Sequence, residues 1–321
     1  MQRHIYLFIL PAFFIFFSIL TYGIVMSLPV HCNHIKHYIT IPKNATLSST
    51  SRILNDNLCV NSILFKIVMK ISMNEQNIKY GRYDFKSVNN MRDLVDMVTS
   101  VSSDRVQITV IEGLKMQEIA LYLEKKMNID IETFLSLCYD KSLIKDLGLN
   151  DISSLEGYLY PDTYKLLKTY TEIDIIKIMV NQFLFNFNEN ISSETVLSDS
   201  DIVILASIIQ GEAIYTDEMK KISSVYHNRL NRNMLLQADP TIQYILPKKK
   251  RRILVKDTKI DNPYNTYVYK GLPPGPINNP GLDALVAASD PMKTDYLYFV
   301  ANNKGRHDFN ETYRGHLRSK K

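Results

Sequence analysis

The sequence is short of the residues that mark several protein classes. It contains no Trp, 3 Cys, 11 Gly and 12 Pro among 321 residues. So little Gly and Pro excludes a collagen-like or low-complexity chain. The cysteines, Cys32, Cys59 and Cys138, are far apart and odd in number, which indicates no disulfide framework and leaves one optional pair. Hydrophobic residues at 45% and charged residues at 22% are ordinary globular values, and the length predicts about two folded units.

The chain also lacks a large excess of charge. Lys and Arg number 38 against 33 Asp and Glu, a net charge of +5, and the five consecutive bases Lys248–Arg252 account for all of it. The remainder is balanced, which argues against an extended nucleic-acid-binding surface. No nucleic acid is expected as a partner.

No Asp, Glu, Lys or Arg occurs from Ile5 to Val30. As a helix at about 1.5 Å per residue this run reaches roughly 39 Å, more than the roughly 30 Å hydrocarbon layer. A secretory signal has a shorter apolar centre and a small-x-small cleavage site, which Ser27-Leu28-Pro29 matches poorly. We therefore predict a retained, single-pass membrane anchor over residues 1–30, with the lipid bilayer as a partner. The alternative, an export signal, also places the rest of the chain across the membrane.

Four potential metal ligands follow this segment: His31, Cys32, His34 and His37. Their spacing is irregular and no second ligand set lies at a defined separation, so we interpret residues 31–37 as a solvated linker. Nothing in the sequence indicates a metal or another cofactor.

Hydrophobic periodicity predicts a small α+β arrangement after the linker. Strand-like alternation covers residues 38–42, 79–85 and 107–111, and helix-like spacing covers 46–58, 60–72, 91–98 and 116–123. Further helices are predicted over 131–139 and 173–188. The tyrosine-rich stretch Glu156–Tyr164 separates these two helices, and it is consistent with simple packing or with a carbohydrate-facing wall.

The sequence predicts a buried helix that ends in a carboxyl group. Ser198 can cap it, acids occupy its first turn, and residues 202–209 are almost wholly apolar. Glu212 would emerge at the edge of the core, where burial and the negative end of the helix dipole both raise its pKa, as a general acid requires. On periodicity alone, the simpler interpretation is that Glu212 marks where the helix reaches solvent. Gly211 permits close approach of a ligand or backbone, or merely ends the helix.

Three stretches rich in Pro, Gly and polar residues follow a further helix that begins near Thr216. They cover residues 237–241, 264–267 and 271–281, and we predict rigid loops there. Their polar side chains suit the hydroxyls and acetamides of a sugar chain, although rigid structural turns are an equal alternative. Residues 296–301 predict a buried strand, followed by a basic tail.

Several linked motifs together resemble the MltG (YceG-like) family of endolytic murein transglycosylases. They are EGYLYPDTY (156–164), LASIIQGEA (205–213), NRL (228–230), LQADPT (236–241), YNTY (264–267), GLPPG (271–275), NPG (279–281) and YLYFVA (296–301). The resemblance extends over about residues 106–316. It implies an α+β protein with an anchor at 1–30, a linker and small LysM-like subdomain at 31–105, and a larger mixed catalytic domain at 106–321.

By this resemblance the protein is a lyase at the bacterial inner membrane, with its catalytic domain on the periplasmic side. It would cleave MurNAc-GlcNAc bonds within peptidoglycan glycan strands to leave 1,6-anhydro ends and limit strand length, beside cell-wall synthases. Glu212 matches the catalytic carboxyl, while Gln210 stands where the family usually has another acid. The sugar-binding residues expected from the loops are Gln237, Asp239, Thr241, Asn265 and Tyr267.

Two other functions remain as hypotheses. One is a non-catalytic peptidoglycan-binding protein in which Glu212 is structural. The other is a pyridoxal-phosphate lyase, a label that the family has carried, but no phosphate-binding Gly-rich turn is paired with a Schiff-base Lys. The run Lys248–Arg252 departs from the composition expected of the family, and we interpret it as a solvated loop or a contact with an anionic wall polymer.

Overall fold

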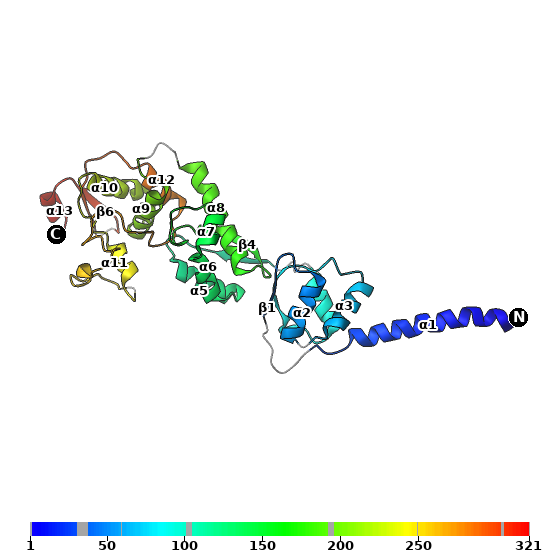
Figure 1. The fold of residues 1–321 in the computed structure, drawn as a ribbon. Helices are drawn as coiled ribbons and strands as arrows, with labels where there is room; N and C mark the ends of the chain where they lie inside the picture. Colours follow the sequence, from blue (N-terminus) through cyan, green and yellow to red (C-terminus); the bar gives the residue numbers. More distant parts are fainter. Residues whose placement is uncertain are drawn as a thin grey trace. The chain divides into compact units, whose positions relative to one another are not determined.

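The computed structural model describes residues 2–30, 38–58, 60–100, 105–191, 196–248, 250–302 and 305–320, with side chains from residue 13 onward. This part of the chain is mostly helical, with strands in two-stranded sheets (Figure 1). The chain forms two compact units, which are residues 1–106 with 166–171, and residues 107–165 with 172–321. The fold is therefore mixed α+β, as the sequence predicts.

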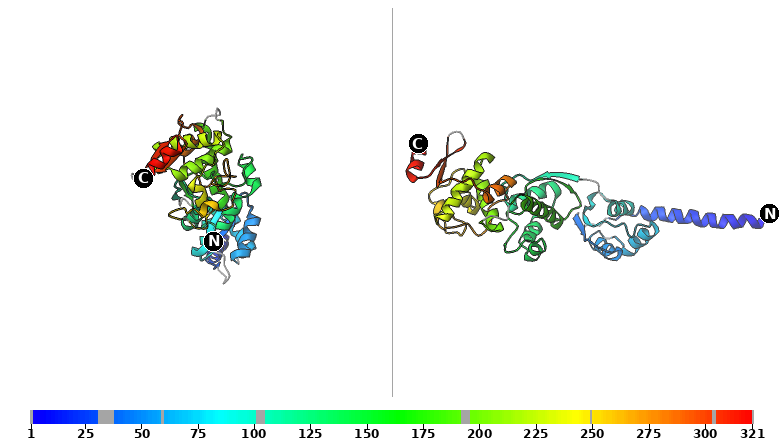
Figure 2. Two further views of the ribbon diagram at one scale, coloured as in Figure 1. Left: turned by 90° about the vertical axis from the view of Figure 1, so that its left-hand side faces the viewer. Right: turned by 90° about the horizontal axis from the view of Figure 1, so that it is seen from above.

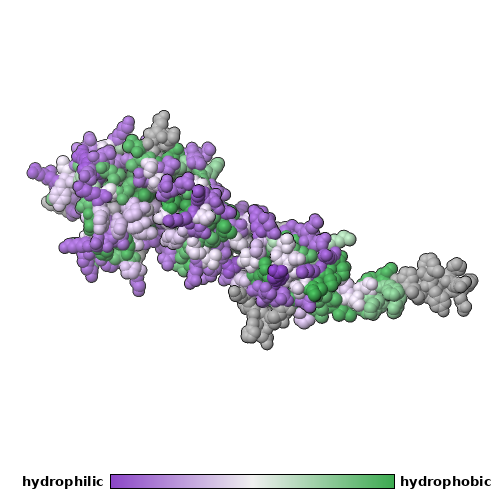
Figure 3. Space-filling view, in the orientation of Figure 1, coloured by the Kyte–Doolittle hydropathy of each residue, from purple (hydrophilic) through white to green (hydrophobic). Residues whose placement is uncertain are grey.

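Unit 1 begins with the helix α1, Gln2–Met26. From Phe13 to Ile24 most of its large apolar side chains are exposed, and they form an apolar surface in Figure 3. Its end joins the unit 1 core through buried Met26 and Val30, and the Met91 amide donates to the Leu28 carbonyl (3.0 Å). No helix in the described ranges is both long and apolar enough to cross a bilayer, so the anchor stays a prediction. The cluster from His31 to His37 lies outside the described residues.

The rest of unit 1 follows the order predicted from periodicity. Its elements are β1 (Tyr38–Ile41), α2 (Leu47–Leu58), α3 (Ser62–Ile71), β2 (Gly81–Asp84), the short 3-10 helix η1 (Phe85–Ser87) and α4 (Met91–Thr99). The strands β1 and β2 pair antiparallel with Ile39 opposite Tyr83. Buried side chains such as Leu54, Phe65 and Phe85 form one core.

A second segment, residues 166–171, completes unit 1 at β2. The Arg82 amide donates to the Thr169 carbonyl (2.6 Å). Gly81 is required at this contact because its φ is +141° and a Cβ there would lie 2.5 Å from the Thr169 carbonyl oxygen. The segment begins with the last two residues of β4 (Thr163–Leu167), a strand that pairs with β3 (Arg105–Thr109) and that periodicity did not predict.

Unit 2 holds the remaining elements. Its helices are α5 (Met116–Met127), α6 (Ile131–Cys138), α7 (Lys141–Asp146), α8 (Glu172–Asn190), α9 (Asp199–Glu212), α10 (Met219–Asn231), α11 (Asp239–Ile245), α12 (Leu282–Ser289) and α13 (Tyr313–Ser319). The 3-10 helices η2 (Thr216–Glu218) and η3 (Asp257–Lys259) and the strands β5 (Tyr298–Ala301) and β6 (His307–Asn310) complete it. Within the unit, α9 packs against α10, α11 and α12, and the views in Figure 2 show these helices together.

Several predictions for unit 2 need correction. Residues 239–245 form the helix α11, where a rigid loop was predicted over 237–241, and the basic tail contains β6 and α13. The strand predicted over 296–301 covers 298–301 and is not buried, because Tyr298, Phe299 and Val300 are half-exposed and Ala301 is exposed. Phe299 of β5 packs on α10, where its ring lies 5.9 Å from that of Tyr226, and Tyr298 packs on α13, but residues 298–301 also line a cleft, which leaves them partly exposed.

Cys138 is a buried free thiol in α6. The other two cysteines lie outside the described residues, so the optional disulfide stays untested. Burial raises the pKa of the Cys138 thiol strongly, which keeps it protonated and unreactive.

Candidate active site

The helix α9 carries Glu212 at its C-terminal end. The Ser198 side chain accepts the Asp201 amide and caps the helix, and every residue from 202 to 209 is buried. Helices with apolar side chains on all faces are held by packing on all sides. Glu212 is half-buried and lies three residues beyond the buried stretch 202–209. The packing of α9 therefore fixes the position of Glu212.

The loop 271–281 is held against α9 by three hydrogen bonds. The Ser207 hydroxyl accepts the Ile277 amide (3.0 Å), and the Asn278 side-chain amide donates to the Ser207 carbonyl (2.7 Å). The Gln210 side-chain oxygen accepts the Gly281 amide (3.0 Å). Gln210, at the position where an acid was expected by resemblance, therefore fixes a loop.

Gly211 allows α11 to approach the end of α9. A Cβ at this residue would lie 2.7 Å from Cβ and 2.9 Å from Cγ of Pro240. Real side chains do not tolerate such distances without displacement of the backbone. Of the roles that the sequence left open for Gly211, close approach of another backbone is the one that the structure requires. This contact places Asp239 beside Glu212.

Glu212 has a raised pKa. Burial raises it first, and the negative charge of Asp239 adds to the effect, giving a pKa of about 7. Hydrogen bonds from the Tyr226 hydroxyl (3.0 Å to Oε1) and from the Asp239 amide, together with the charge of Arg229, act in the opposite direction. The direction agrees with the sequence-based prediction, and the charge of Asp239 is a cause that the sequence did not indicate. A carboxyl with this pKa holds its proton near neutral pH and can release it.

Two clefts meet at this carboxyl. The smaller has a volume of about 510 Å³ and the larger about 1080 Å³. Glu212 and Asp239 line both, Tyr298 lines the smaller, and Tyr139 and Tyr244 line the larger. A chain-like ligand that occupied both clefts would place an internal bond beside Glu212.

Three of the predicted sugar-binding residues line the smaller cleft. Gln237 is exposed and adopts a left-handed backbone conformation with φ of +51°, which turns the chain between α10 and α11. The Tyr267 hydroxyl donates to Asp239 Oδ1 (2.6 Å). Gln237, Asp239 and Tyr267 are therefore brought together around Glu212.

Thr241 and Asn265 lie beneath the cleft instead. The Thr241 side chain is 0% exposed, and its hydroxyl contacts the Ala238 carbonyl (2.7 Å) and the Thr266 hydroxyl (3.0 Å). The Asn265 side-chain amide donates to the Thr258 and Ile260 carbonyls, and its oxygen accepts the Tyr267 amide. Both side chains hold the loops in place and lie away from the two cleft surfaces.

Two residues of α10 complete the surroundings of Glu212, and sequence reasoning missed their roles. Tyr226 lies on the buried face of α10, and Arg229 lies three residues further along the same helix face. Arg229 Nε donates to the Leu297 carbonyl (2.7 Å), and Nη1 donates to the carbonyls of Leu235 and Leu236. A hydroxyl and a guanidinium on a buried face are the signal that could have identified them.

A second buried carboxyl, Glu156, lines the larger cleft. It is 5% exposed, and its Oε1 accepts the Met116 amide (2.9 Å) and the Asn279 side-chain amide (3.1 Å). Asn279 also accepts the amides of Gly157 and Leu159, so it ties the motif 156–164 to the loop 271–281. Burial raises the pKa of Glu156 to about 7, against the lowering effects of the Met116 amide and Lys115.

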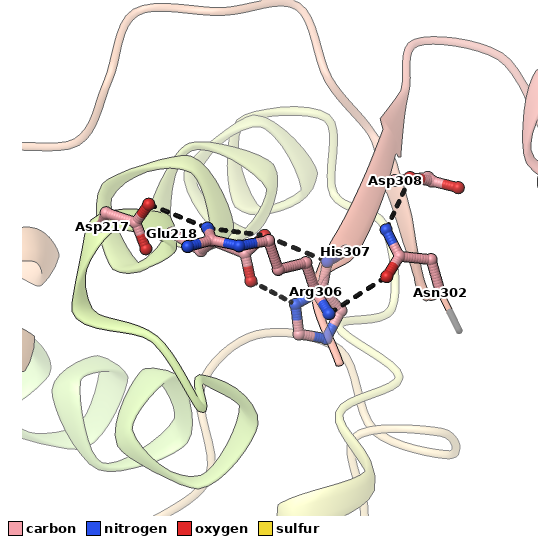
Figure 4. Close-up of polar contacts among 6 residues, drawn as sticks. All are labelled: Asp217, Glu218, Asn302, Arg306, His307 and Asp308. Carbon is pink, nitrogen blue, oxygen red and sulfur yellow. Dashed lines mark hydrogen bonds and ion pairs between the residues drawn. The ribbon is translucent and has the colours of Figure 1, made fainter. Parts of the chain in front are cut away.

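The strands β5 and β6 form a wall of the smaller cleft that is fixed to η2. Arg306 Nη1 pairs with Asp217 Oδ2 (2.8 Å), and the His307 ring pairs with Glu218 Oε2 (3.1 Å), as Figure 4 shows. The His307 amide also donates to Glu218 Oε1 (3.0 Å). Because η2 directly follows α9 in the chain, this contact holds the wall in register with Glu212.

Part of the basic run 248–252 has a structural role. Lys250 Nζ pairs with the buried Asp257 Oδ1 (2.7 Å), and its backbone makes two hydrogen bonds with the Gln243 side chain. Lys250 and Arg251 line the larger cleft, while Lys249 lies outside the described residues. Lys250 is therefore held in place by the rest of the unit, and interpretation of the run as a solvated loop is incomplete.

The site as described is organised around a single proton-carrying carboxyl in an open, polar cleft. Across the described ranges, no group of three or more His, Cys, Asp or Glu side chains is placed to hold a metal ion. In this arrangement one carboxyl can act as both the acid and the base toward an extended polar ligand.

Comparison with known proteins points in the same direction. The chain matches the YceG-like family over residues 39–321. It is 35% identical over 303 residues to an endolytic murein transglycosylase of Bacillus subtilis (strain 168), covering 88% of this chain and 83% of that protein. It is 29% identical over 332 residues to an endolytic murein transglycosylase of Streptococcus pneumoniae, and spans 59% of that longer protein. The crystal structure of a YceG-like protein of Listeria monocytogenes is similar with a TM-score of 0.60 and 32% identity, covering 88% of this chain and 98% of that one.

Proposed function

Because this chain belongs to the YceG-like family, we propose that it is an endolytic murein transglycosylase in which Glu212 is the catalytic residue. The observation that carries the assignment of Glu212 is its place at the junction of two clefts, with a pKa raised to about 7. Family membership supports the type of reaction, and the surroundings of Glu212 support its assignment as the catalytic residue.

The reaction needs one group that gives and then takes a proton. Protonated Glu212 donates its proton to the oxygen of the MurNAc-GlcNAc bond while the bond from that oxygen to the MurNAc anomeric carbon breaks, assisted by the substrate acetamide. The resulting carboxylate removes the proton of the MurNAc 6-hydroxyl, and that oxygen bonds to the anomeric carbon. Glu212 regains its proton, no water is consumed, and a 1,6-anhydro end remains. A second carboxylate, which ordinary glycosidases use, is not required.

The neighbours of Glu212 suit both stages of this cycle. Burial favours the protonated form at the start. The Tyr226 hydroxyl and the Asp239 amide donate hydrogen bonds that stabilise the carboxylate formed after the first transfer. The opposing effects keep the pKa near neutrality, where one group acts efficiently as acid and as base.

The rim of the smaller cleft supplies sugar contacts in this proposal. Gln237 and Asp239 are exposed polar side chains within it, and Tyr267 offers an aromatic face next to them. Thr241 and Asn265 act indirectly, since their side chains hold the two loops that carry these residues. Occupation of both clefts by one strand explains cleavage within a strand and not only at its end.

We also propose that residues 1–30 anchor the protein in the bacterial inner membrane with unit 2 on the periplasmic side. The charge-free run from Ile5 to Val30 and the exposed apolar side chains of the described part of α1 support this. The β1–α2–α3–β2 order of unit 1 supports a LysM-like subdomain that holds glycan. Such a placement suits partners among cell-wall synthases and an action that limits nascent strand length.

Product analysis tests the proposed function. Purified full-length protein is incubated with glycan strands, and the products are separated and identified by mass spectrometry. Internal cuts that leave 1,6-anhydroMurNAc ends are expected from the unmodified protein. Intact strands that nevertheless bind the protein would overturn the proposal and identify a non-catalytic peptidoglycan-binding protein.

A further inference from the structure

Resting on the proposed function, we propose that three basic side chains of the smaller cleft form a subsite for a carboxylate of the murein strand. They are Arg229, His316 and Lys320, called the basic cluster below. Murein carries such carboxylates next to its MurNAc sugars, either on the free lactyl group or on the peptide attached to it. The two sources present the same chemistry to the protein.

Two members of the basic cluster, Arg229 and His316, pack on one aromatic ring. The Arg229 guanidinium carbon lies 5.3 Å from the centroid of the Tyr298 ring, and the His316 ring stacks on Tyr298 at 5.4 Å. Arg229 comes from α10, Tyr298 from β5 and His316 from α13, and Lys320 directly follows α13, so tertiary structure alone assembles them. All line the same cleft as Glu212.

Within the described residues no Asp or Glu forms an ion pair with this cluster, although the charge of Glu212 acts on Arg229. Arg229 is 7% exposed, yet among the described residues it donates hydrogen bonds to three backbone carbonyls, and its Nη2 makes no hydrogen bond there. His316 Nδ1 is buried and also lacks a partner in that part of the chain. A largely buried charge is costly unless it is paired, so an external anion that bound in the cleft beside Arg229 would give its guanidinium an ion-pair partner.

The electrostatics of His316 agree with this arrangement. Burial lowers its pKa first, and the positive charges of Lys320 and Arg229 lower it further. Lys320 and Arg229 therefore lie close enough to His316 for their positive charges to disfavour its protonation. A carboxylate fits better than a neutral sugar hydroxyl because a guanidinium holds a carboxylate by charge-assisted, geometrically matched hydrogen bonds.

Binding measurements on an inactive background test the subsite. In Glu212→Gln, which removes turnover, isothermal titration compares three probes of equal sugar length. These are peptide-bearing murein strands, strands stripped to the free lactyl carboxylate, and a neutral chito-oligosaccharide. We expect at least one carboxylate-bearing probe to bind about tenfold more tightly than the neutral one, with a preference that weakens as salt rises.

Substitution of the cluster should remove the preference. Lys320→Gln combined with His316→Asn is expected to bring the carboxylate and neutral probes to within about twofold of each other. Arg318→Gln is the matched control, because it removes one charge from the same helix at an exposed side chain that does not line the cleft. Arg229 is left unchanged because it also holds the backbone of Leu235 and Leu236.

Each outcome is decisive. Preference for peptide-bearing strands alone assigns the subsite to peptide carboxylates, and equal preference for stripped strands assigns it to the lactyl carboxylate. Equal affinity for all three probes, or an equal loss in Arg318→Gln, overturns the subsite. If the unmodified protein leaves anhydro ends but shows no carboxylate preference, only the subsite fails. Preference without any cleavage overturns the proposed function alone.

Discussion

Glu212 and Glu156 are two carboxyls in one unit that have the same raised pKa for the same main reason. Burial brings each to about 7. Their surroundings differ: Glu212 is half-buried at the meeting of two clefts and accepts a tyrosine hydroxyl, whereas Glu156 is 5% exposed and accepts one backbone and one side-chain amide. Glu156 ties loops together, while Glu212 leaves part of its surface open to a ligand.

This difference shows that a raised pKa does not by itself mark a catalytic acid. Burial disfavours the charged form wherever the carboxyl lies. What separates the two residues is access, because a general acid must come within hydrogen-bonding distance of the atom that it protonates. Perturbed carboxyls therefore need to be weighed together with the clefts that reach them.

The largest expected effect is the loss of activity in Glu212→Gln. The amide keeps the shape but cannot give or take the proton, so cleavage should fall by about 10³-fold or more. Mass spectrometry of released anhydro products measures this, and circular dichroism confirms the fold. Glu156→Gln is the matched control and should keep activity within about tenfold; an equal loss in both variants would contradict the comparison.

Gly211→Ala should have the next largest effect. Its new methyl group meets Pro240, so the end of α9 and the first turn of α11 must separate. We expect destabilisation by about 1–3 kcal/mol and a kcat lowered by about 10- to 100-fold, since Glu212 is displaced. Chemical denaturation and single-substrate kinetics measure both. Gly23→Ala, where no atom lies within 4 Å of the added carbon, should change neither.

Glu156 should make the free energy of unfolding depend on pH. Its pKa is about 7 in the folded protein against an ordinary value of 4.5, so its stabilising contribution is complete below about pH 4.5 and is lost as pH rises through about 7. That difference corresponds to on the order of 3 kcal/mol. Urea unfolding at pH 5 and pH 8 should show a smaller decrease for Glu156→Gln than for the unmodified protein. Equal pH dependence of the unfolding free energy in the two proteins would contradict a raised pKa of Glu156 in the folded state.

Tyr226→Phe should cause the smallest of these changes. The lost hydrogen bond stabilises the Glu212 carboxylate, so its removal raises the pKa of Glu212 further. We expect the limb of the kcat/KM profile that falls with rising pH to move upward by about one unit. Ser223→Ala on the same helix serves as the control. If this limb of the pH profile does not move, the hydrogen bond from Tyr226 does not control the pKa of Glu212.

The sequence predicted the framework of the site well where patterns are local. The Ser198 cap and the apolar run 202–209 were sufficient for α9, and β1, α2, α3 and α4 were equally clear from periodicity. The helix α11 was missed because Asp239-Pro240 was interpreted as a turn, although Asp and Pro are also typical of a first helical turn. The strand at 298–301 was expected to be buried because composition does not reveal that its residues line a cleft.

The sequence by itself determined that a buried helix ends in a carboxyl, because caps and apolar periodicity act within one segment. Only the tertiary structure decided what that carboxyl meets. Tyr226, Asp239 and the basic cluster come from separate elements, and burial depends on how those elements pack. The pKa of Glu212 and the clefts on either side of it arise from contacts between residues distant in the chain, which no local pattern encodes.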